Sequence, residues 1–228
     1  MKLSRQQERR INALSYVAIM GNGPQELIPD LSRYEAVIDV WIGADRGSLT
    51  LVKHNMTPHY AVGDFDSLDE AERETVRNRA TVFDQYPSEK DETDLEIAIK
   101  TAYALNPEKI YLFGVTGGRL DHALINIQLL YSMMEQNIQG IIADQQNQLQ
   151  LTEPGQHEIS HDSHYPMISF IPYTKVVKRL TLEGFYYPLI DEIISWGSTR
   201  CISNKLISNF GTFSYKEGIL LVIKSREA

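Results

Sequence analysis

Four short motifs in this sequence gather acids, bases and glycines whose spacing could support chemistry on phosphates. They are "ADRG" at residues 44–47, "GDFDS" at 63–67, "KDETD" at 90–94 and "GGRLDH" at 117–122. In "GDFDS" two aspartates flank one aromatic residue. Two carboxylates so near each other repel unless a cation or a shared proton lies between them. Mg²⁺ binds through one or two carboxylates together with substrate phosphates. The acids therefore predict a magnesium site.

Glycine-rich segments accompany the acids. In "GVTGGRLDH", the backbone amides of Gly117 and Gly118 and the start of the next helix could approach phosphate oxygens, and Arg119 could clamp them. "GNGP", which contains Gly21 and Asn22, could contact phosphate in the same way, and a plain tight turn is the alternative for both segments. Neither segment is a P-loop or a full dinucleotide fingerprint. The motifs together predict a site for a magnesium polyphosphate.

The elements that must position these motifs alternate between strand-like and helix-like segments up to about residue 143. Segments from Asp94 and from Asp121 carry apolar residues at helical spacing. Short apolar runs that are typical of strands lie at 14–20, 36–44, 59–64, 80–86, 109–115 and 138–144. This alternation predicts an α/β fold with a Rossmann-like, mostly parallel sheet and flanking helices. Ligands of such sheets bind beyond the carboxyl ends of the strands, so the motifs should meet at one edge.

After about residue 147 the pattern changes to short strand-like runs separated by Gly, Pro and Asn, with no convincing long helix. Such a pattern is typical of a small all-β sandwich or barrel. We therefore predict an α/β domain at residues 1–146, followed by a β domain at 147–228.

Several of the aspartates have a simpler interpretation as helix N-caps. Asp91 with Asp94, or Asp121 alone, could satisfy free amides at the start of a helix. In "DFDSLDE", Ser67 and Glu70 match the spacing of a capping box, which leaves Asp64 and Asp66 without that role. Several acids at separate strand ends favour a shared site over chance.

The composition of the chain limits which partners it can bind and in which cellular compartment we expect it. The 228-residue chain has a formal net charge of -8 and no long basic run, which argues against nonspecific binding to nucleic acid or to anionic lipid. Cys201 is the single cysteine, so no internal disulfide can form, which suits a reducing cytoplasm. The apolar stretch at 14–20 is too short for a signal core or a membrane span. We expect a cytoplasmic protein with small-molecule partners, without nucleic acid or membrane among them.

The ordered set of motifs, followed by "LEGFYYPL" and "ISN", resembles the thiamin pyrophosphokinase family over about residues 15–225. The resemblance implies an α/β nucleotide domain followed by a thiamin-binding β-sandwich. It also implies a homodimer whose sites lie between domains of different subunits. The activity it implies is transfer of a pyrophosphoryl group from ATP to the hydroxyl of thiamin, which gives thiamin diphosphate and AMP.

The resemblance also implies residue roles. It places the Mg²⁺ ligands at Asp64, Asp66 and Asp94, with Asp45 and Arg119 completing the catalytic set. Motifs and resemblance together assign these residues to the nucleotide: Gly21, Asn22, Arg46, Lys90, Asp91, Thr93, Gly117, Gly118, Arg119 and Asp121.

On the thiamin side, the resemblance assigns Ser203 and Asn204, although Lys205 follows them where many bacterial members have an acid. Thiamin is a cation with aromatic rings, so an aromatic wall beside carboxylates would hold it. Candidates for that wall are Trp196, Phe185 and Tyr186, for which a place in the hydrophobic core is the alternative.

Two other classes of function remain open. A Mg²⁺-dependent phosphatase with an aspartyl nucleophile also shows Asp-x-Asp after a strand, but it leaves the β-rich tail unexplained. A protein that binds a nucleotide or thiamin without turnover would keep the glycine loops and could lose the acids.

Overall fold

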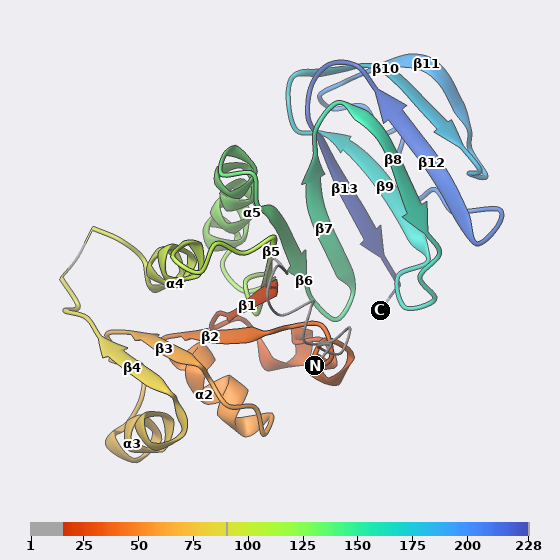
Figure 1. The fold of residues 1–228 in the computed structure, drawn as a ribbon. Coiled ribbons are helices and arrows are strands. Elements are labelled where there is room, and N and C mark those ends of the chain that lie inside the picture. Colours follow the sequence, from red (N-terminus) through yellow and green to blue (C-terminus); the bar gives the residue numbers. More distant parts are fainter. Residues whose placement is uncertain (1–15, 90, 228) are drawn as a thin grey trace, which may run out of the picture.

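The computed structural model describes residues 16–89 and 91–227, which form two layered units along one continuous sheet (Figure 1). The first six strands are all parallel, in the order β4-β3-β2-β1-β5-β6. Their bounds are β1 Tyr16–Met20, β2 Val40–Ala44, β3 Tyr60–Gly63, β4 Val82–Gln85, β5 Lys109–Phe113 and β6 Gln139–Ala143. Each predicted apolar run contains one of these strands, so the predicted Rossmann-like sheet is confirmed.

Helices cover both faces of the parallel strands. They are α2 Arg46–Lys53, α3 Glu70–Arg79, α4 Asp94–Tyr103 and α5 Leu120–Glu135, with short 3₁₀ turns η1 Gln25–Leu27 and η2 Leu31–Arg33. On one face, α4 and α5 bury apolar side chains against alternate residues of β1, β2, β3, β5 and β6. On the other face, α2 and the 3₁₀ turns cover Ala18, Met20 and Trp41. Burial on both faces explains why these strands read as unbroken apolar runs.

The remaining strands build the sandwich. They are β7 Asn147–Thr152, β8 Gly155–Ser160, β9 Met167–Pro172, β10 Val176–Glu183, β11 Leu189–Ser195, β12 Phe210–Tyr215 and β13 Leu220–Ser225. Strands β7, β13 and β9 extend the large sheet in antiparallel pairing, whereas β11, β10, β12 and β8 form a second sheet. Phe170 and Val222 of the first layer pack with Leu180 and Phe213 of the second. The predicted β-sandwich is therefore present.

One hydrogen-bonded sheet runs through both units. The predicted boundary between residues 146 and 147 falls at the turn from β6 to β7, and these two strands still pair, with Ile141 opposite Gln150. Side chains alternate along β7, so Leu149 and Leu151 pack with the core under α5 while Gln148 and Gln150 point to the other face. Within the described chain, no helix is long and apolar enough to cross a membrane.

The helix starts differ from the sequence prediction at α3. Its N-cap is Asp69, whose carboxylate accepts the backbone N–H of Glu72 at 2.8 Å, while Glu72 accepts from the Asp69 backbone in return. The predicted capping box of Ser67 and Glu70 is therefore wrong, because the loop after β3 continues two residues further before the helix begins. Thr93 caps α4 in the same reciprocal way with Glu96.

Asp144 holds the junction between the two units. It is 4% exposed, and one carboxylate oxygen accepts the backbone N–H groups of Gln146 and Asn147 at 2.8 and 2.7 Å. The other oxygen accepts the Thr116 hydroxyl at 2.7 Å, and the Asp144 carbonyl accepts the Tyr165 hydroxyl at 2.5 Å. One buried residue thus ties the β6–β7 turn to the loop after β5 and to the strand-β9 region.

We expect Asp144→Ala to lower the free energy of unfolding by about 3 kcal/mol, because it leaves buried N–H and hydroxyl donors without their charged acceptor. Denaturant unfolding of the purified variant measures this loss. Asp30→Ala is a matched control, since Asp30 also accepts a backbone N–H two residues on but is exposed. A similar loss in both variants would contradict the assigned role of Asp144.

Candidate active site at the carboxyl edge of the sheet

Three aspartates converge at the carboxyl ends of neighbouring strands. Asp45 follows β2, Asp64 follows β3, and Asp94 is the first residue of α4. Each offers a carboxylate oxygen, and these oxygens lie within 4.8 Å of one another. All three side chains are half-buried. Parallel strands ending side by side therefore do bring acids from separate motifs together, as the sequence analysis expected.

Asp45 has a strained backbone that directs its carboxylate into this cluster. Its φ of 48° lies in the left-handed region, where a residue other than glycine costs about 1–3 kcal/mol. The Ser67 hydroxyl donates to Asp45 Oδ2 at 2.7 Å. The other oxygen, Oδ1, is buried and accepts no hydrogen bond from any described residue.

This donor set fits a divalent cation. Oxygen ligands from carboxylates are what Mg²⁺ prefers, and a buried carboxylate oxygen without a donor is costly unless a cation or another group satisfies it. Asp45, assigned in the sequence analysis to the catalytic set but not to the metal, stands inside the cluster. Among the described residues, the group does not include Asp66.

Asp66 lies beside the cluster on the same loop. Its backbone N–H donates to Asp64 Oδ1 at 3.0 Å, and its exposed carboxylate accepts the Ser88 hydroxyl. The residue between the two acids, Phe65, has a φ of 59°, is fully buried and stacks on Phe83 at 4.4 Å. The aromatic residue of "GDFDS" is thus an anchor that fixes both neighbouring acids relative to the core.

The predicted phosphate-binding loops lie next to each other because β1 and β5 are adjacent. The Gly21 N–H donates to the Phe113 carbonyl at 2.8 Å, and a Cβ on Gly21 would lie 2.7 Å from the Gly114 carbonyl oxygen. Gly21 is therefore required for packing, whereas Asn22 is exposed. Gly117 and Gly118 both have positive φ, and no described atom lies within 4 Å of a Cβ built on Gly118. The space on the Cβ side of Gly118 is therefore open.

Arg119 and Asp121 form an exposed pair at the start of α5. The guanidinium donates to both carboxylate oxygens of Asp121, at 3.1 and 2.5 Å. This hydrogen bond lowers the pKa of Asp121 to about 2 and raises the pKa of Arg119. Exposed pairs of this kind are worth little, so Arg119 can exchange its partner for a phosphate at small cost.

The other predicted nucleotide residues have varied surroundings. Both terminal nitrogens of the Arg46 guanidinium donate to Glu72, and one also donates to the Ser67 carbonyl. Thr93 is exposed and uses its hydroxyl to cap α4, and Asp91 is exposed in the same loop. Lys90 lies outside the described residues.

The predicted thiamin residues lie in the sandwich, near β9. The Ser203 backbone N–H donates to Ser169 Oγ at 3.0 Å, and the Trp196 indole, 62% exposed, donates to the Tyr173 carbonyl at 3.3 Å. Asn204 is 2% exposed, and its side chain bonds the backbone of Tyr187 in both directions. The Asn204 amide therefore holds the Tyr187 segment in place.

The aromatic candidates separate by burial. Phe185 is 2% exposed and belongs to the sandwich core, which corrects its place as a candidate for the thiamin wall. Tyr186 is 56% exposed, with the Lys205 ammonium 4.6 Å from its ring centroid. Of the three, Trp196 and Tyr186 present a ring to solvent.

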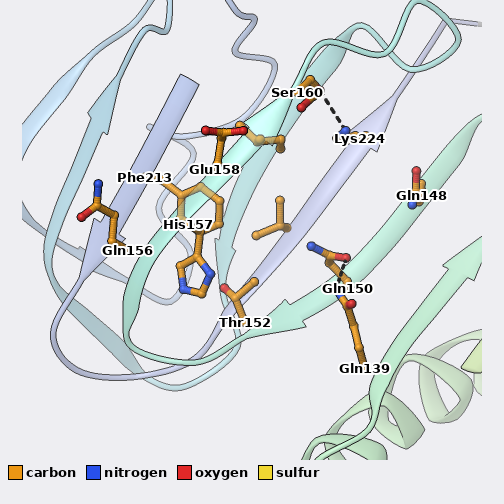
Figure 2. Close-up of a pocket in the computed structure, with 12 residues that line it drawn as sticks. Gln139, Gln148, Gln150, Thr152, Gln156, His157, Glu158, Ser160, Phe213 and Lys224 are labelled. Carbon is orange, nitrogen blue, oxygen red and sulfur yellow. Dashed lines mark hydrogen bonds between the residues drawn. The ribbon is translucent and has the colours of Figure 1, made fainter. Parts of the chain in front are cut away.

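A separate cavity of about 580 Å³ opens between β7 and β13 on one side and β8 on the other (Figure 2). Gln139 donates to Gln150 at 2.9 Å across its floor, and Lys224 donates to the Ser160 carbonyl at 3.0 Å. None of the described site residues lines it. Its lining combines four glutamines with His157, Lys224 and a single acid, Glu158, so it holds no carboxylate cluster.

The fold and the acid cluster define an α/β protein with a candidate divalent-cation site at its sheet edge and a β-sandwich that continues the sheet. Residues 31–142 match the family described as thiamin pyrophosphokinase, catalytic domain, and residues 156–220 match thiamin pyrophosphokinase, vitamin B1 binding domain. The chain belongs to the thiamin pyrophosphokinase family, as its motifs predicted.

Individual relatives agree with this placement. The chain is 45% identical over 211 residues to a thiamine pyrophosphokinase of Bacillus subtilis (strain 168), covering 92% of this chain and 99% of that protein. The crystal structure of thiamine pyrophosphokinase from Bacillus subtilis superposes with a TM-score of 0.88 at 44% identity, over 94% of this chain and 100% of that one. A thiamin pyrophosphokinase structure from Geobacillus thermodenitrificans gives 0.82 at 42% identity, over 93% and 98%.

Gly63 makes room for the strained Asp45. Its φ is 149°, and a Cβ there would lie 3.0 Å from both the Asp45 N and Cα atoms. We expect Gly63→Ala to lower the free energy of unfolding by about 1–3 kcal/mol and to weaken binding of Mn²⁺, used as a probe for Mg²⁺. Denaturant unfolding and Mn²⁺ titration measure the two effects.

Gly155→Ala is the matched control, because Gly155 has a φ of 156° but its nearest described neighbour would be 3.6 Å from the new Cβ. This variant should keep its Mn²⁺ affinity. Equal affinities in the two variants would show that Gly63 does not position Asp45.

Proposed function

We propose that this protein transfers a pyrophosphoryl group from ATP to the hydroxyl of thiamin, giving thiamin diphosphate and AMP in a Mg²⁺-dependent reaction. The observation that carries the proposal is the convergence of Asp45, Asp64 and Asp94 at one edge of the sheet, in a member of the thiamin pyrophosphokinase family. Carboxylates that converge from separate elements at one sheet edge can bind a metal ion that in turn binds a polyphosphate.

In this proposal Asp45, Asp64 and Asp94 hold Mg²⁺, and Asp66 lies beside them on the loop after β3. When bound, Mg²⁺ would offset the negative charge that spreads over the phosphate oxygens during transfer. The protein contributes positioning. Phe65, stacked on Phe83, and Asp45, held by the Ser67 hydroxyl, fix the carboxylates before the substrates arrive.

The phosphates would be held by the loop after β5. The open space beside the Gly118 Cα and the N-terminus of α5 favour an anion, and within the described chain the α5 N-cap, Arg119, makes no side-chain cap hydrogen bond. Arg119 would turn from Asp121 to a phosphate oxygen and help to neutralise the developing charge. The proton of the thiamin hydroxyl would pass to a nearby acid, for which Asp66 is a better candidate than a residue that ligates the metal.

The thiamin side supports a site shared between two subunits. Ser203 and Trp196 lie near β9, at the far edge of the large sheet from the acids after β3. Seven strand-to-strand steps separate β3 from β9, which amounts to about 30 Å. One chain therefore holds the two groups far apart (Figure 1), and a homodimer can bring the sandwich of one subunit to the acids of the other.

Exposed apolar side chains on the sandwich offer surface for such an assembly. Ile190, Ile193 and Ile207 are 82%, 61% and 68% exposed, and Trp196 is 62% exposed. Exposed apolar residues that gather on one unit are typical of surfaces that meet a partner. Because Asn204 is buried, we propose that it shapes the Tyr187 segment while Ser203 and Trp196 contact thiamin.

The first test mixes purified protein with ATP, Mg²⁺ and thiamin and resolves the products. We expect AMP and thiamin diphosphate in equal amounts, and a loss of more than about 100-fold in Asp64→Asn without a change in folding, because one ligand charge is removed. An aspartyl phosphatase would instead form a phosphoenzyme and release phosphate, and a binding protein would release neither product. ADP as the product would refute pyrophosphoryl transfer.

A second test asks whether the site is shared between subunits. Asp64→Asn and Trp196→Ala variants are each made alone and then co-refolded in equal amounts. If acids and thiamin contacts come from different subunits, half of the dimers are mixed and each holds one intact site, which restores about a quarter of the parental activity. A mixture no more active than the average of the two variants would place both groups in a site within one subunit.

A further inference from the structure

Arg46 and Ser67 form a brace behind the acid cluster. We infer that Arg46 is a positioning residue that acts on the metal site through Ser67 and Asp45, rather than a ligand of the nucleotide. This inference rests on the proposed function. It replaces the sequence-based assignment of Arg46 to the nucleotide.

The brace begins at the Asp45 carboxylate. Its Oδ2 accepts the Ser67 hydroxyl at 2.7 Å, which fixes the rotation of the carboxylate, while the buried Oδ1 accepts no hydrogen bond from a described residue. Groups that hydrogen-bond a metal-ligating carboxylate orient it and set its affinity for the metal. Ser67 therefore governs how the Asp45 carboxylate is oriented within the acid cluster.

Arg46 holds Ser67 in turn. Its Nη1 donates to the Ser67 carbonyl at 2.6 Å, which fixes the backbone that carries the Ser67 hydroxyl. The same guanidinium donates from Nη1 and Nη2 to the Glu72 carboxylate at 3.3 and 3.2 Å. Glu72 also completes the capping box of α3 with Asp69. The first residue of α2 is thus tied to the loop after β3 and to the first turn of α3.

These contacts leave Arg46 poorly placed to bind phosphate. Both terminal nitrogens of Arg46 are engaged by the Glu72 carboxylate, which also pairs with Lys53, and only 36% of the Arg46 side chain is exposed. A phosphate that took the place of Glu72 would remove the acceptor that also completes the capping box at the start of α3. Arg119 differs in both respects, since its side chain is 73% exposed and its carboxylate partner, Asp121, is 62% exposed.

The experiment measures metal binding without turnover. Mn²⁺ is titrated alone into each protein and followed by electron paramagnetic resonance, and ADP binding is measured separately in EDTA. We expect Ser67→Ala and Arg46→Lys to weaken Mn²⁺ binding by about tenfold and to leave ADP binding in EDTA unchanged, since lysine keeps the charge but lacks the planar fork. The double variant should lose no more than the weaker-binding single variant, because both residues act through one contact.

Two controls match the two changes. Ser32→Ala removes a serine hydroxyl that donates to Asp30 at 2.7 Å, the same distance as in the brace, and Arg179→Lys changes an arginine that donates to both carboxylate oxygens of Asp191 in the sandwich. Both should keep their Mn²⁺ affinity within about twofold. Ser67 is exposed, so Ser67→Ala remains informative if Arg46→Lys proves unstable.

The outcomes separate this inference from the proposed function. Mn²⁺ affinity unchanged in Ser67→Ala would overturn the brace while leaving the metal site intact. Weaker ADP binding in EDTA with unchanged Mn²⁺ affinity in Arg46→Lys would return Arg46 to the nucleotide. A parental protein that binds no Mn²⁺ would overturn both the brace and the metal assignment. In turnover, the expected signature is a raised Mg²⁺ requirement with kcat at saturating Mg²⁺ within about twofold of the parent.

Discussion

Repulsion between carboxylates is the constraint on which the rest of the site depends. Three aspartates from separate elements place oxygens within 4.8 Å of one another, and like charges at that distance move apart unless the backbone prevents it. The protein prevents it by mounting Asp45 and Asp64 on the ends of adjacent buried strands and Asp94 on a capped helix start. The folded protein is therefore less stable than it would be without the acid cluster, and a bound cation would offset the repulsion. Backbone strain, as at Asp45, is expected at functional sites.

The continuous sheet is the reason that the proposed site would be shared between two subunits. A chain that wrapped its sandwich back over the acid edge could complete a site alone, but here β7, β13 and β9 extend the sheet away from β2 and β3. Asp144 fixes this direction, because its buried carboxylate ties the β6–β7 turn to the loop after β5. The large separation between acids and sandwich is therefore built into the fold rather than set by a flexible linker.

The spacing of apolar residues, and the order of strand-like and helix-like segments along the chain, were enough to predict the fold class. Apolar runs alternating with helical spacing predicted each parallel strand. Strand polarity predicted that Asp45 and Asp64 would meet, whereas Asp94 joins them from the start of a helix. Sequence could not rank the acids, because it cannot show that Asp45 turns inward with a left-handed backbone while Asp66 turns toward Ser88. It also misplaced the capping box, since Ser67 and Glu70 have the same spacing as Asp69 and Glu72 and only the loop length decides between them. Nor does any local pattern reveal that Arg46 pairs with Glu72, 26 residues away.

The five residues of "GDFDS" act together in building the acid cluster. Gly63 lets the strand pass close to Asp45, Asp64 joins the cluster, and Phe65 anchors the loop in the core. Asp66 stands beside the cluster, and Ser67 braces the acid of the neighbouring strand. Only two of the five side chains are candidates for contact with metal or substrate. Phe65 fixes where those two lie, and Gly63 and Ser67 support Asp45 of the neighbouring strand. A motif of this kind is specific because its spacing places supporting residues as well as the reactive acids. Replacing a supporting residue should therefore impair the site even though every acid remains present.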